Sequence, residues 1–212
     1  NELYITELSS FQLERAGDLD LAVATVLNLT PDHLDRHGNF RAYRRAKRRI
    51  FAAARCIVFN AEDENTIPPT VGSIPSFSWR YGVPLDEEFG LREKSGTVWI
   101  AKGSEPLLPV SELALPGRHN VANALAALCL GCAIQLSTDA MLEALRSFPG
   151  LAHRCELVAD SDGIRWINDS KATNVGASLA AIEGLGNNKN LVLIAGGEGK
   201  GADFTALANS VA

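Results

Sequence analysis

The sequence predicts an α/β protein in two parts. Nearly continuous apolar stretches alternate with helical patterns through residues 1–149, which is typical of strands buried on both faces of a mostly parallel sheet. Short Gly-containing turns between strand patterns predict a small antiparallel hairpin region within that part. Phe-Pro-Gly at residues 148–150 marks a boundary, and a second α/β unit is expected in residues 150–212.

The first part opens with two apolar patterns that predict strands. Leu-Tyr-Ile-Thr at residues 3–6 predicts a short buried strand that ends at Glu7, and residues 19–29 predict a second, nearly all apolar strand. A helix is expected from about residue 39 to 55, and Cys-Ile-Val-Phe-Asn at residues 56–60 predicts a third strand. These strands would form the parallel part of the sheet.

The remaining elements of the first part are a hairpin and two helices. Residues 89–92 and 97–101 flank a Lys-Ser-Gly turn and predict an antiparallel hairpin. Apolar helical patterns follow at about residues 120–135 and 138–147.

The second part repeats this alternation after the boundary. Residues 155–160 and 164–168 flank a Ser-Asp-Gly turn and predict a hairpin. A helix over about residues 175–185, a strand over 190–195 and a further helix beyond Gly196-Gly197 are then expected.

Composition and charge exclude several classes of protein. Hydrophobic residues make up 46% and charged residues 21%, which is near the globular average. The formal net charge of −5 provides no overall cationic field for nucleic acid. No apolar run approaches the roughly 20 residues that span a bilayer. We therefore expect neither a nucleic-acid partner nor a membrane span.

The basic helix over residues 39–55 separates one lysine from its arginines. At about 100° per residue, the five arginines between 41 and 49 share one polar face, for which exposure to solvent is a sufficient explanation. Lys47 falls on the apolar stripe instead, where burial would lower its pKa. A neutral amine can add CO2 to form a carbamate, an oxygen ligand for metals. A lysine that extends its ammonium to solvent is the alternative.

Two polar residues follow the first two predicted strands. Glu7 ends the first, and His33 follows the second in Thr-Pro-Asp-His. Carboxylates at the carboxyl ends of parallel strands line the ligand crevice of such sheets, where they commonly hold Mg²⁺. A capping role for Glu7 and a surface loop for His33 remain alternatives.

Polar groups also stand at two predicted helix starts. Asn120 and Asn123 are three residues apart and share a helix face, and an Asn amide can pair with adenine; N-capping by Asn120 is the alternative. The run 169–174, Asp-Ser-Lys-Ala-Thr-Asn, leaves a hairpin and enters a helix, a position that suits a phosphate or carboxylate.

A glycine-rich run, Gly-Gly-Glu-Gly-Lys-Gly, occupies residues 196–201. It is not a Walker A loop, because Gly201 rather than Ser or Thr follows Lys200. Gly197, Gly199 and Ala202 fit a weak dinucleotide-binding pattern, so a dinucleotide turn stays open.

Six motifs in order resemble the Mur ligases of peptidoglycan synthesis, and within them the members that add D-glutamate. They are residues 7–14 (Glu-Leu-Ser-Ser-Phe-Gln-Leu-Glu), 28–36 (Asn-Leu-Thr-Pro-Asp-His-Leu-Asp-Arg), 45–47 (Arg-Ala-Lys), 118–124 (Arg-His-Asn-Val-Ala-Asn-Ala), 153–154 (His-Arg) and 168–174 (Asn-Asp-Ser-Lys-Ala-Thr-Asn). The similarity covers essentially all 212 residues. It implies that residues 1–149 are the later part of a central ATPase domain and residues 150–212 the first part of a Rossmann-like, amino-acid-binding domain.

The resemblance also implies a reaction. ATP would phosphorylate the carboxylate of UDP-N-acetylmuramoyl-L-alanine, and the amine of D-glutamate would attack the acyl phosphate. The family's phosphate loop has no counterpart in the 212 residues, so this stretch alone is expected to be inactive. The resemblance further implies a cytoplasmic, ADP-forming, monomeric enzyme.

Roles for individual residues follow from the same resemblance. Glu7 and His33 would position Mg²⁺, and Lys47 would carry a carbamate that holds a second Mg²⁺. The remaining expected contacts are adenine for Asn120 and Asn123, the γ-phosphate for Arg154, ribose for Asp169, the acyl phosphate and D-glutamate for Lys171, Thr173 and Lys200, and substrate for Ser9 and Gln12. Ala152 and Cys155 depart from the family pattern at positions that would pack at the hinge between domains.

Three other functions remain open. A sister Mur ligase or a folylpolyglutamate-type ligase would use the same ATPase residues. A Rossmann-type module could bind a nucleotide without catalysis. A nucleic-acid binder would use the arginine helix, against which the net charge argues.

Overall fold

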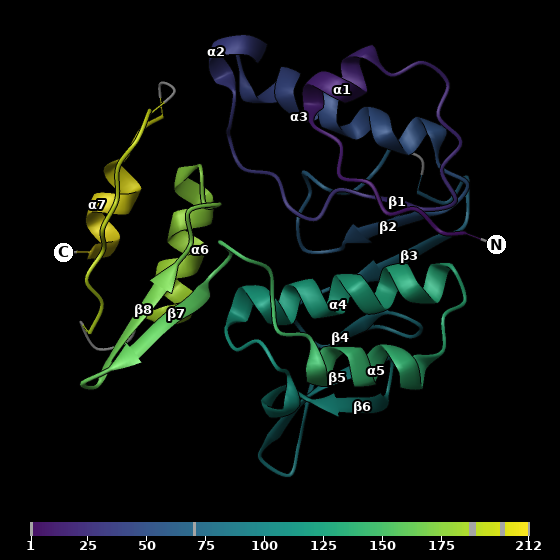
Figure 1. Ribbon diagram of the computed structural model, residues 1–212. Helices are drawn as coiled ribbons and strands as arrows, with labels where there is room; N and C mark the ends of the chain where they lie inside the picture. The colour runs from purple at the N-terminus through teal and green to yellow at the C-terminus, as the bar shows by residue number, and fades with distance from the viewer. Residues whose placement is uncertain (1, 70, 187–189, 200–201, 212) are drawn as a thin grey trace.

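The computed structural model describes residues 2–69, 71–186, 190–199 and 202–211, and its largest unit is a six-stranded sheet (Figure 1). The strands follow one another in chain order across that sheet: β1 (Ala24–Thr25), β2 (Ile57–Asn60), β3 (Ser76–Trp79), β4 (Phe89–Lys94), β5 (Thr97–Lys102) and β6 (Glu105–Pro109). β1 to β4 pair in parallel, whereas β4, β5 and β6 pair antiparallel. The predicted fold class, a mostly parallel sheet with an antiparallel hairpin region, is confirmed.

Helices cover this sheet in two groups. The helical segments of the first part are α1 (Ser10–Arg15), α2 (Leu34–His37), α3 (Phe40–Arg48), the 3₁₀ turns η1 (Arg49–Ala53) and η2 (Val110–Glu112), α4 (Arg118–Ala133) and α5 (Thr138–Ser147). α1, α2 and α3 gather beside β1 and β2 in Figure 1. α4 packs on β2, β3 and β4 and carries α5 on another side.

Two apolar clusters hold the layers together. The larger joins the sheet to α4, whose Leu125, Leu128 and Cys129 are almost fully buried. The smaller joins α3 to the start of the sheet, with Tyr43 packed in the same cluster as Ile57 of β2. α3 therefore packs against the sheet with its apolar face, while Arg41 and Arg45 on the other side are exposed.

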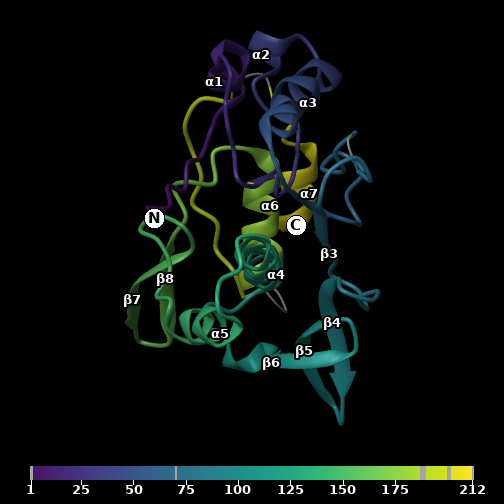
Figure 2. The same cartoon turned by 90° about the vertical axis from the view of Figure 1, so that its right-hand side faces the viewer.

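The second part packs against α4. It contains the antiparallel hairpin of β7 (Glu156–Ser161) and β8 (Ile164–Asn168), followed by α6 (Val175–Leu185) and α7 (Thr205–Val211). α4 and α6 are in contact, and Figure 2 shows α4 nearly end-on with α6 above it. The contact is close: a side chain at Gly176 would lie 2.8 Å from Thr30, and one at Gly184 would lie 2.8 Å from His119.

Three strand predictions are wrong in whole or in part. Residues 3–6 and 190–195 form no strand, and only residues 24–25 of the stretch 19–29 do so. A strand needs a neighbouring strand to satisfy its backbone groups, and neither 3–6 nor 190–195 has one in the described part of the chain. Side chains of both segments are exposed, among them Ile5 at 92% and Val192 at 90%.

The helix predictions agree better with the structure. The expected helices over about 120–135, 138–147 and 175–185 appear as α4, α5 and α6, and the basic helix appears as α3 continued by η1. None of the described helices is long and apolar enough to cross a membrane.

Candidate active site

The site is built around Lys47 on the packed side of α3. The side chain of Asn39 caps this helix by accepting from the Ala42 N–H at 2.9 Å. Lys47 is half-buried, and its Nζ donates to the Leu8 carbonyl oxygen at 3.3 Å. Burial lowers the pKa of Lys47, and the nearby carboxylates of Glu7 and Asp32 only partly oppose that shift.

Glu7 lies next to the segment that Lys47 contacts and reaches toward the second part of the chain. Its side chain is 92% exposed, and one carboxylate oxygen lies 3.9 Å from the guanidinium of Arg154. Arg154 stands just before β7, so this ion pair joins the two predicted parts at the site. An exposed pair of this kind contributes little to stability, which leaves both groups available to a ligand.

Ser9 and Gln12 follow Glu7 and form the start of α1. The Ser9 hydroxyl accepts from the Gln12 N–H at 3.2 Å, and the Gln12 side chain accepts from the Ser9 N–H at 2.8 Å. This capping box fixes where the helix begins. The structure thus places both residues beside Glu7 but engages their polar groups within the helix.

His33 is held in an unusual backbone conformation at the start of α2. Its φ of 52° lies in the left-handed region, which is uncommon for residues other than glycine. Its N–H donates to the Asp32 carboxylate at 2.8 Å, and its ring meets Phe11 edge-on at 5.0 Å. Because Asp32 also acts on the pKa of Lys47, His33 and Lys47 share this acidic neighbour.

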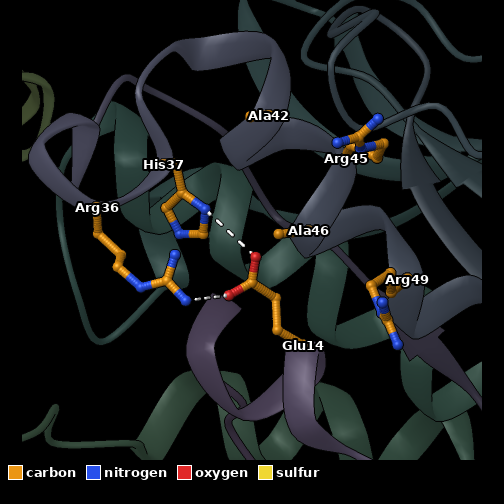
Figure 3. Close-up of a pocket in the computed structure, with 7 residues that line it drawn as sticks. All are labelled: Glu14, Arg36, His37, Ala42, Arg45, Ala46 and Arg49. Carbon is orange, nitrogen blue, oxygen red and sulfur yellow. Dashed lines mark hydrogen bonds and ion pairs between the residues drawn. The ribbon is translucent and has the colours of Figure 1, made fainter.

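A buried polar chain behind His33 was not predicted. The ring of His37 is 2% exposed, lies 3.0 Å from the Ser10 hydroxyl and 3.7 Å from the Glu14 carboxylate, and stacks on Phe11. Figure 3 shows Glu14 turned toward both His37 and Arg36. The i,i+4 spacing of the two histidines was visible in the sequence, but their contacts to α1 depend on how the chain folds back.

Asp169 lies at the other end of the site, near the start of α4. Its carboxylate accepts from the Cys155 N–H at 3.1 Å. Burial raises the pKa of Cys155 to about 11, and the nearby negative charge of Asp169 adds to this shift. Burial lowers the pKa of His119, and Asp169 opposes that shift, so Asp169 stands close to the first turn of α4.

Asn120 and Asn123 lie on that same first stretch of α4. The Asn120 side chain donates to the Pro116 carbonyl at 2.8 Å, and Asn123 is exposed. The Nδ1 of neighbouring His119 is buried without a hydrogen-bond partner in the described part of the chain. These residues form a second group, separate from the one around Lys47.

Lys171 and Thr173 form the turn that leads into α6. The Lys171 N–H donates to the His153 carbonyl at 3.1 Å, and both side chains are exposed. The Asn174 side chain caps α6 by accepting from the Ala177 N–H. Lys200 lies outside the described residues.

Comparisons with known proteins identify the family to which the chain belongs. A family model described as the Mur ligase middle domain matches residues 1–131. The chain belongs to the Mur ligase family. Among curated relatives of this Mur ligase chain, UDP-N-acetylmuramoylalanine–D-glutamate ligase of Pseudomonas fluorescens is 54% identical over 100% of the chain and 48% of the relative. The enzyme of that name from Nitrosococcus oceani is 51% identical over 97% of the chain and 46% of the relative.

Solved structures show the same fold. MurF from Acinetobacter baumannii superposes with a TM-score of 0.59 at 21% identity, over 76% of this Mur ligase chain and 37% of that one. UDP-N-acetylmuramate-alanine ligase from Thermotoga maritima gives a TM-score of 0.55 at 23% identity, over 82% and 41%. The Mur ligase chain spans about half the length of the curated relatives it matches.

Proposed function

We propose that the full-length protein is an ATP-dependent, ADP-forming ligase that joins D-glutamate to UDP-N-acetylmuramoyl-L-alanine. The observation that carries this proposal is the half-buried Lys47, with its lowered pKa, next to Glu7 and Asp32. Relatives above 50% identity carry the name of this reaction. ATP and a UDP-linked substrate are found in the cytoplasm, so the proposal includes a cytoplasmic location. It also includes a monomeric state.

The proposal assigns the two parts of the chain different tasks. Residues 1–149 would be the later part of the central ATPase domain, and residues 150–212 the first part of the domain that delivers the amino acid. The Glu7–Arg154 pair and the close packing of Gly176 on Thr30 support this assignment, because they bring the second part to the edge of the first.

The residues around Lys47 fit a magnesium ion only if Lys47 is modified. In the described ranges, no three His, Cys, Asp or Glu side chains are grouped as metal ligands. Glu7 and Asp32 supply hard oxygens, which Mg²⁺ prefers, and a carbamate on Lys47 would add two more. When bound, Mg²⁺ neutralises charge on the phosphates and on the acceptor carboxylate.

Carbamate formation requires the neutral amine, which burial favours here. The lone pair of Nζ bonds to the carbon of CO2, and a proton leaves the nitrogen for solvent. The product is an anion whose charge would be balanced by the metal. His33, whose N–H is bound by Asp32, and Glu7 would complete the set of ligands.

The other predicted site residues remain part of the proposal. Asn120 and Asn123 would meet adenine, and Asp169 would meet ribose, because both groups lie at the start of α4. The exposed Arg154, Lys171 and Thr173 would reach the γ-phosphate and the acyl phosphate from the second part. The engaged polar groups of Ser9 and Gln12 favour an indirect role: they fix the helix start beside Glu7.

The deciding experiment measures ADP release by the full-length protein. UDP-N-acetylmuramoyl-L-alanine and ATP should support release with D-glutamate and not with L-lysine, diaminopimelate or L-alanine. Release with another amino acid, or with a folate acceptor and glutamate, would identify a sister ligase instead. Nucleotide binding without release under any condition would indicate a binding module.

A second experiment separates two interpretations of Lys200. If it pairs with a carboxylate of D-glutamate, Lys200→Ala should raise the D-glutamate KM about 10- to 150-fold, as expected for a lost charge-assisted hydrogen bond. The KM for ATP should change much less. Equal changes in both constants would remove Lys200 from the amino-acid site and restore the dinucleotide-turn interpretation.

A further inference from the structure

The solvent face of α3 concentrates positive charge in an acidic protein. Six of the 20 Lys and Arg residues fall within residues 41–49, five of them arginines of this face, and none of the 25 Asp and Glu residues does, although the whole chain has a net charge of −5. In the run 45–49, every residue except Ala46 and Lys47 is an arginine. This local excess is unrelated to the Lys47 site, which lies on the packed side of the helix.

Three of these arginines have no counter-charge. Arg41, Arg45 and Arg49 are exposed, and none of their side chains makes a hydrogen bond or ion pair with another described residue. They repeat every four residues, so their guanidinium groups stand in a row along the helix. Like charges at this spacing destabilise a helix by about 0.2–0.5 kcal/mol per pair. An anion bound along the row would remove this repulsion.

The row borders an open cavity of about 620 Å³, and the described residues that line it include no acidic one. Five arginines line it, and they are Arg41, Arg44, Arg45, Arg48 and Arg49. A cavity of this size falls within the usual range of about 300–1,000 Å³ for small-molecule sites.

Two walls of this cavity are fixed in place. Arg44 donates to the Asn65 side chain at 3.0 Å, and Arg48 donates to the carbonyl of Ile67. Burial, and then the neighbouring charge of Arg44, lower the pKa of Arg48. These two guanidinium groups are therefore held in place by Asn65 and Ile67.

A second hollow, which Arg45 and Arg49 also line, differs from the first because it contains an acidic residue. It contains Glu14, whose carboxylate is already engaged by Arg36 at 3.3 Å. Figure 3 shows Arg45 and Arg49 across this hollow from Glu14, with no interaction drawn to either. The free arginines are thus not neutralised from this side.

We propose that the five-arginine cavity binds a small molecule that carries two or more phosphate groups. Guanidinium groups bind phosphate oxygens in bidentate pairs, and five of them around one cavity match a chain of phosphates better than a single one. Among the described residues, the lining includes no aromatic ring for a base and no large apolar side chain for a lipid chain. The phosphate chain itself is what this site recognises.

Calorimetry of the full-length protein with inorganic tripolyphosphate, in EDTA at low ionic strength, tests this proposal. We expect saturable binding that weakens from tripolyphosphate to pyrophosphate to orthophosphate. Arg45→Gln and Arg49→Gln should each weaken tripolyphosphate binding about tenfold or more. Arg55→Gln is the matched control, because it removes the same charge outside the cavity, where Arg55 pairs with exposed Asp20 at 3.3 Å.

Three results would overturn the proposal. The first is the absence of saturable binding by the unaltered protein. The second is an equal loss in Arg45→Gln, Arg49→Gln and Arg55→Gln, which would show a general electrostatic effect. The third is binding of polyglutamate through Arg45 without binding of tripolyphosphate, which would indicate a docking surface for an acidic polypeptide. ADP release by the Arg45→Gln protein, expected to be unchanged, shows that the variant is folded.

Discussion

Replacing Glu88 by alanine should destabilise the protein strongly, because this carboxylate is the centre of a buried network between β3 and β4. Its side chain is 5% exposed. It accepts from the Arg80 guanidinium, from the Ser78 hydroxyl at 2.8 Å and from the Leu85 N–H at 3.0 Å. Removing the carboxylate leaves all of these donors without their partner.

The size of the effect follows from the burial of the partners. Breaking a buried ion pair from one side costs about 3–5 kcal/mol. Arg80 retains 25% exposure and can recover some solvation, so we expect about 3 kcal/mol, at the lower end of that range. Since about 2–4 °C of melting temperature corresponds to 1 kcal/mol in a domain of about 150–250 residues, the shift should be about 6–12 °C.

Glu112→Ala is the matched control for this prediction. Glu112 also pairs with an arginine, Arg146 at 2.8 Å, but both side chains are more than one-third exposed. An exposed pair contributes about 0–1 kcal/mol. Thermal and urea unfolding of the two variants should therefore differ by at least about 2 kcal/mol. A loss below 1 kcal/mol in Glu88→Ala, equal to the control, would refute the reasoning.

The same network gives stability a dependence on pH. Burial alone would raise the pKa of Glu88, but hydrogen bonds from Arg80, Leu85 and Ser78 outweigh it and hold the pKa below its usual value. A group with a lowered folded pKa stabilises the protein above its unfolded pKa of about 4.3 and loses that contribution as pH falls through the folded value. The difference in unfolding free energy between the native protein and the Glu88→Gln variant should thus become smaller below about pH 4.

The remaining predictions concern the site and its packing. Lys47→Arg keeps a cation but cannot form a carbamate, so ADP release should be abolished, whereas near-normal turnover would indicate that Lys47 is only a solvent-directed cation. Gly176→Ala places a methyl group 2.8 Å from Thr30 and should weaken the contact between the two parts, measured as faster proteolysis before α6; the double variant with Thr30→Ala should recover. Gly131→Ala should lower the free energy of unfolding in urea by about 1–3 kcal/mol, because the added carbon meets the Met141 sulfur. In Gly96→Ala the added carbon meets no atom, so this variant should show only the backbone strain of its φ of +75°. Residues 1–212 alone should release no phosphate from ATP above a control without protein.

Local chemistry determined which elements could be predicted. α5 and α6 begin after Ser137 and Asn174, whose side chains cap them, and such caps are visible in sequence. β6 was missed because Pro106 and Pro109 argue against a strand, yet an edge strand tolerates them. The stretch over residues 3–6 was wrongly predicted because its apolar pattern contains no information about a pairing partner.

The residues of the candidate site also divide into those that local sequence predicts and those that depend on tertiary contacts. The position of Lys47 on the packed side of α3 follows from helical periodicity, which is a local property. The effect of Asp32 on the pKa of Lys47 and the contacts of His37 with Ser10 and Phe11 depend on how the chain folds back, and no spacing in the sequence indicates these contacts. Their roles could be found only from the structure.

The short first strand has a consequence for how residues 1–212 alone behave at high concentration. β1 pairs only with β2 in the described part of the chain, so its other edge is open, but a two-residue edge offers few backbone groups to a neighbour. The apolar segments around Ile5 and Ile194 are exposed and have strand-like composition. In residues 1–212 taken alone they, rather than the sheet edge, are the expected points of self-association. A charged residue at Ile5 or Ile194 should raise solubility and leave the sheet unchanged, as light scattering and circular dichroism can show.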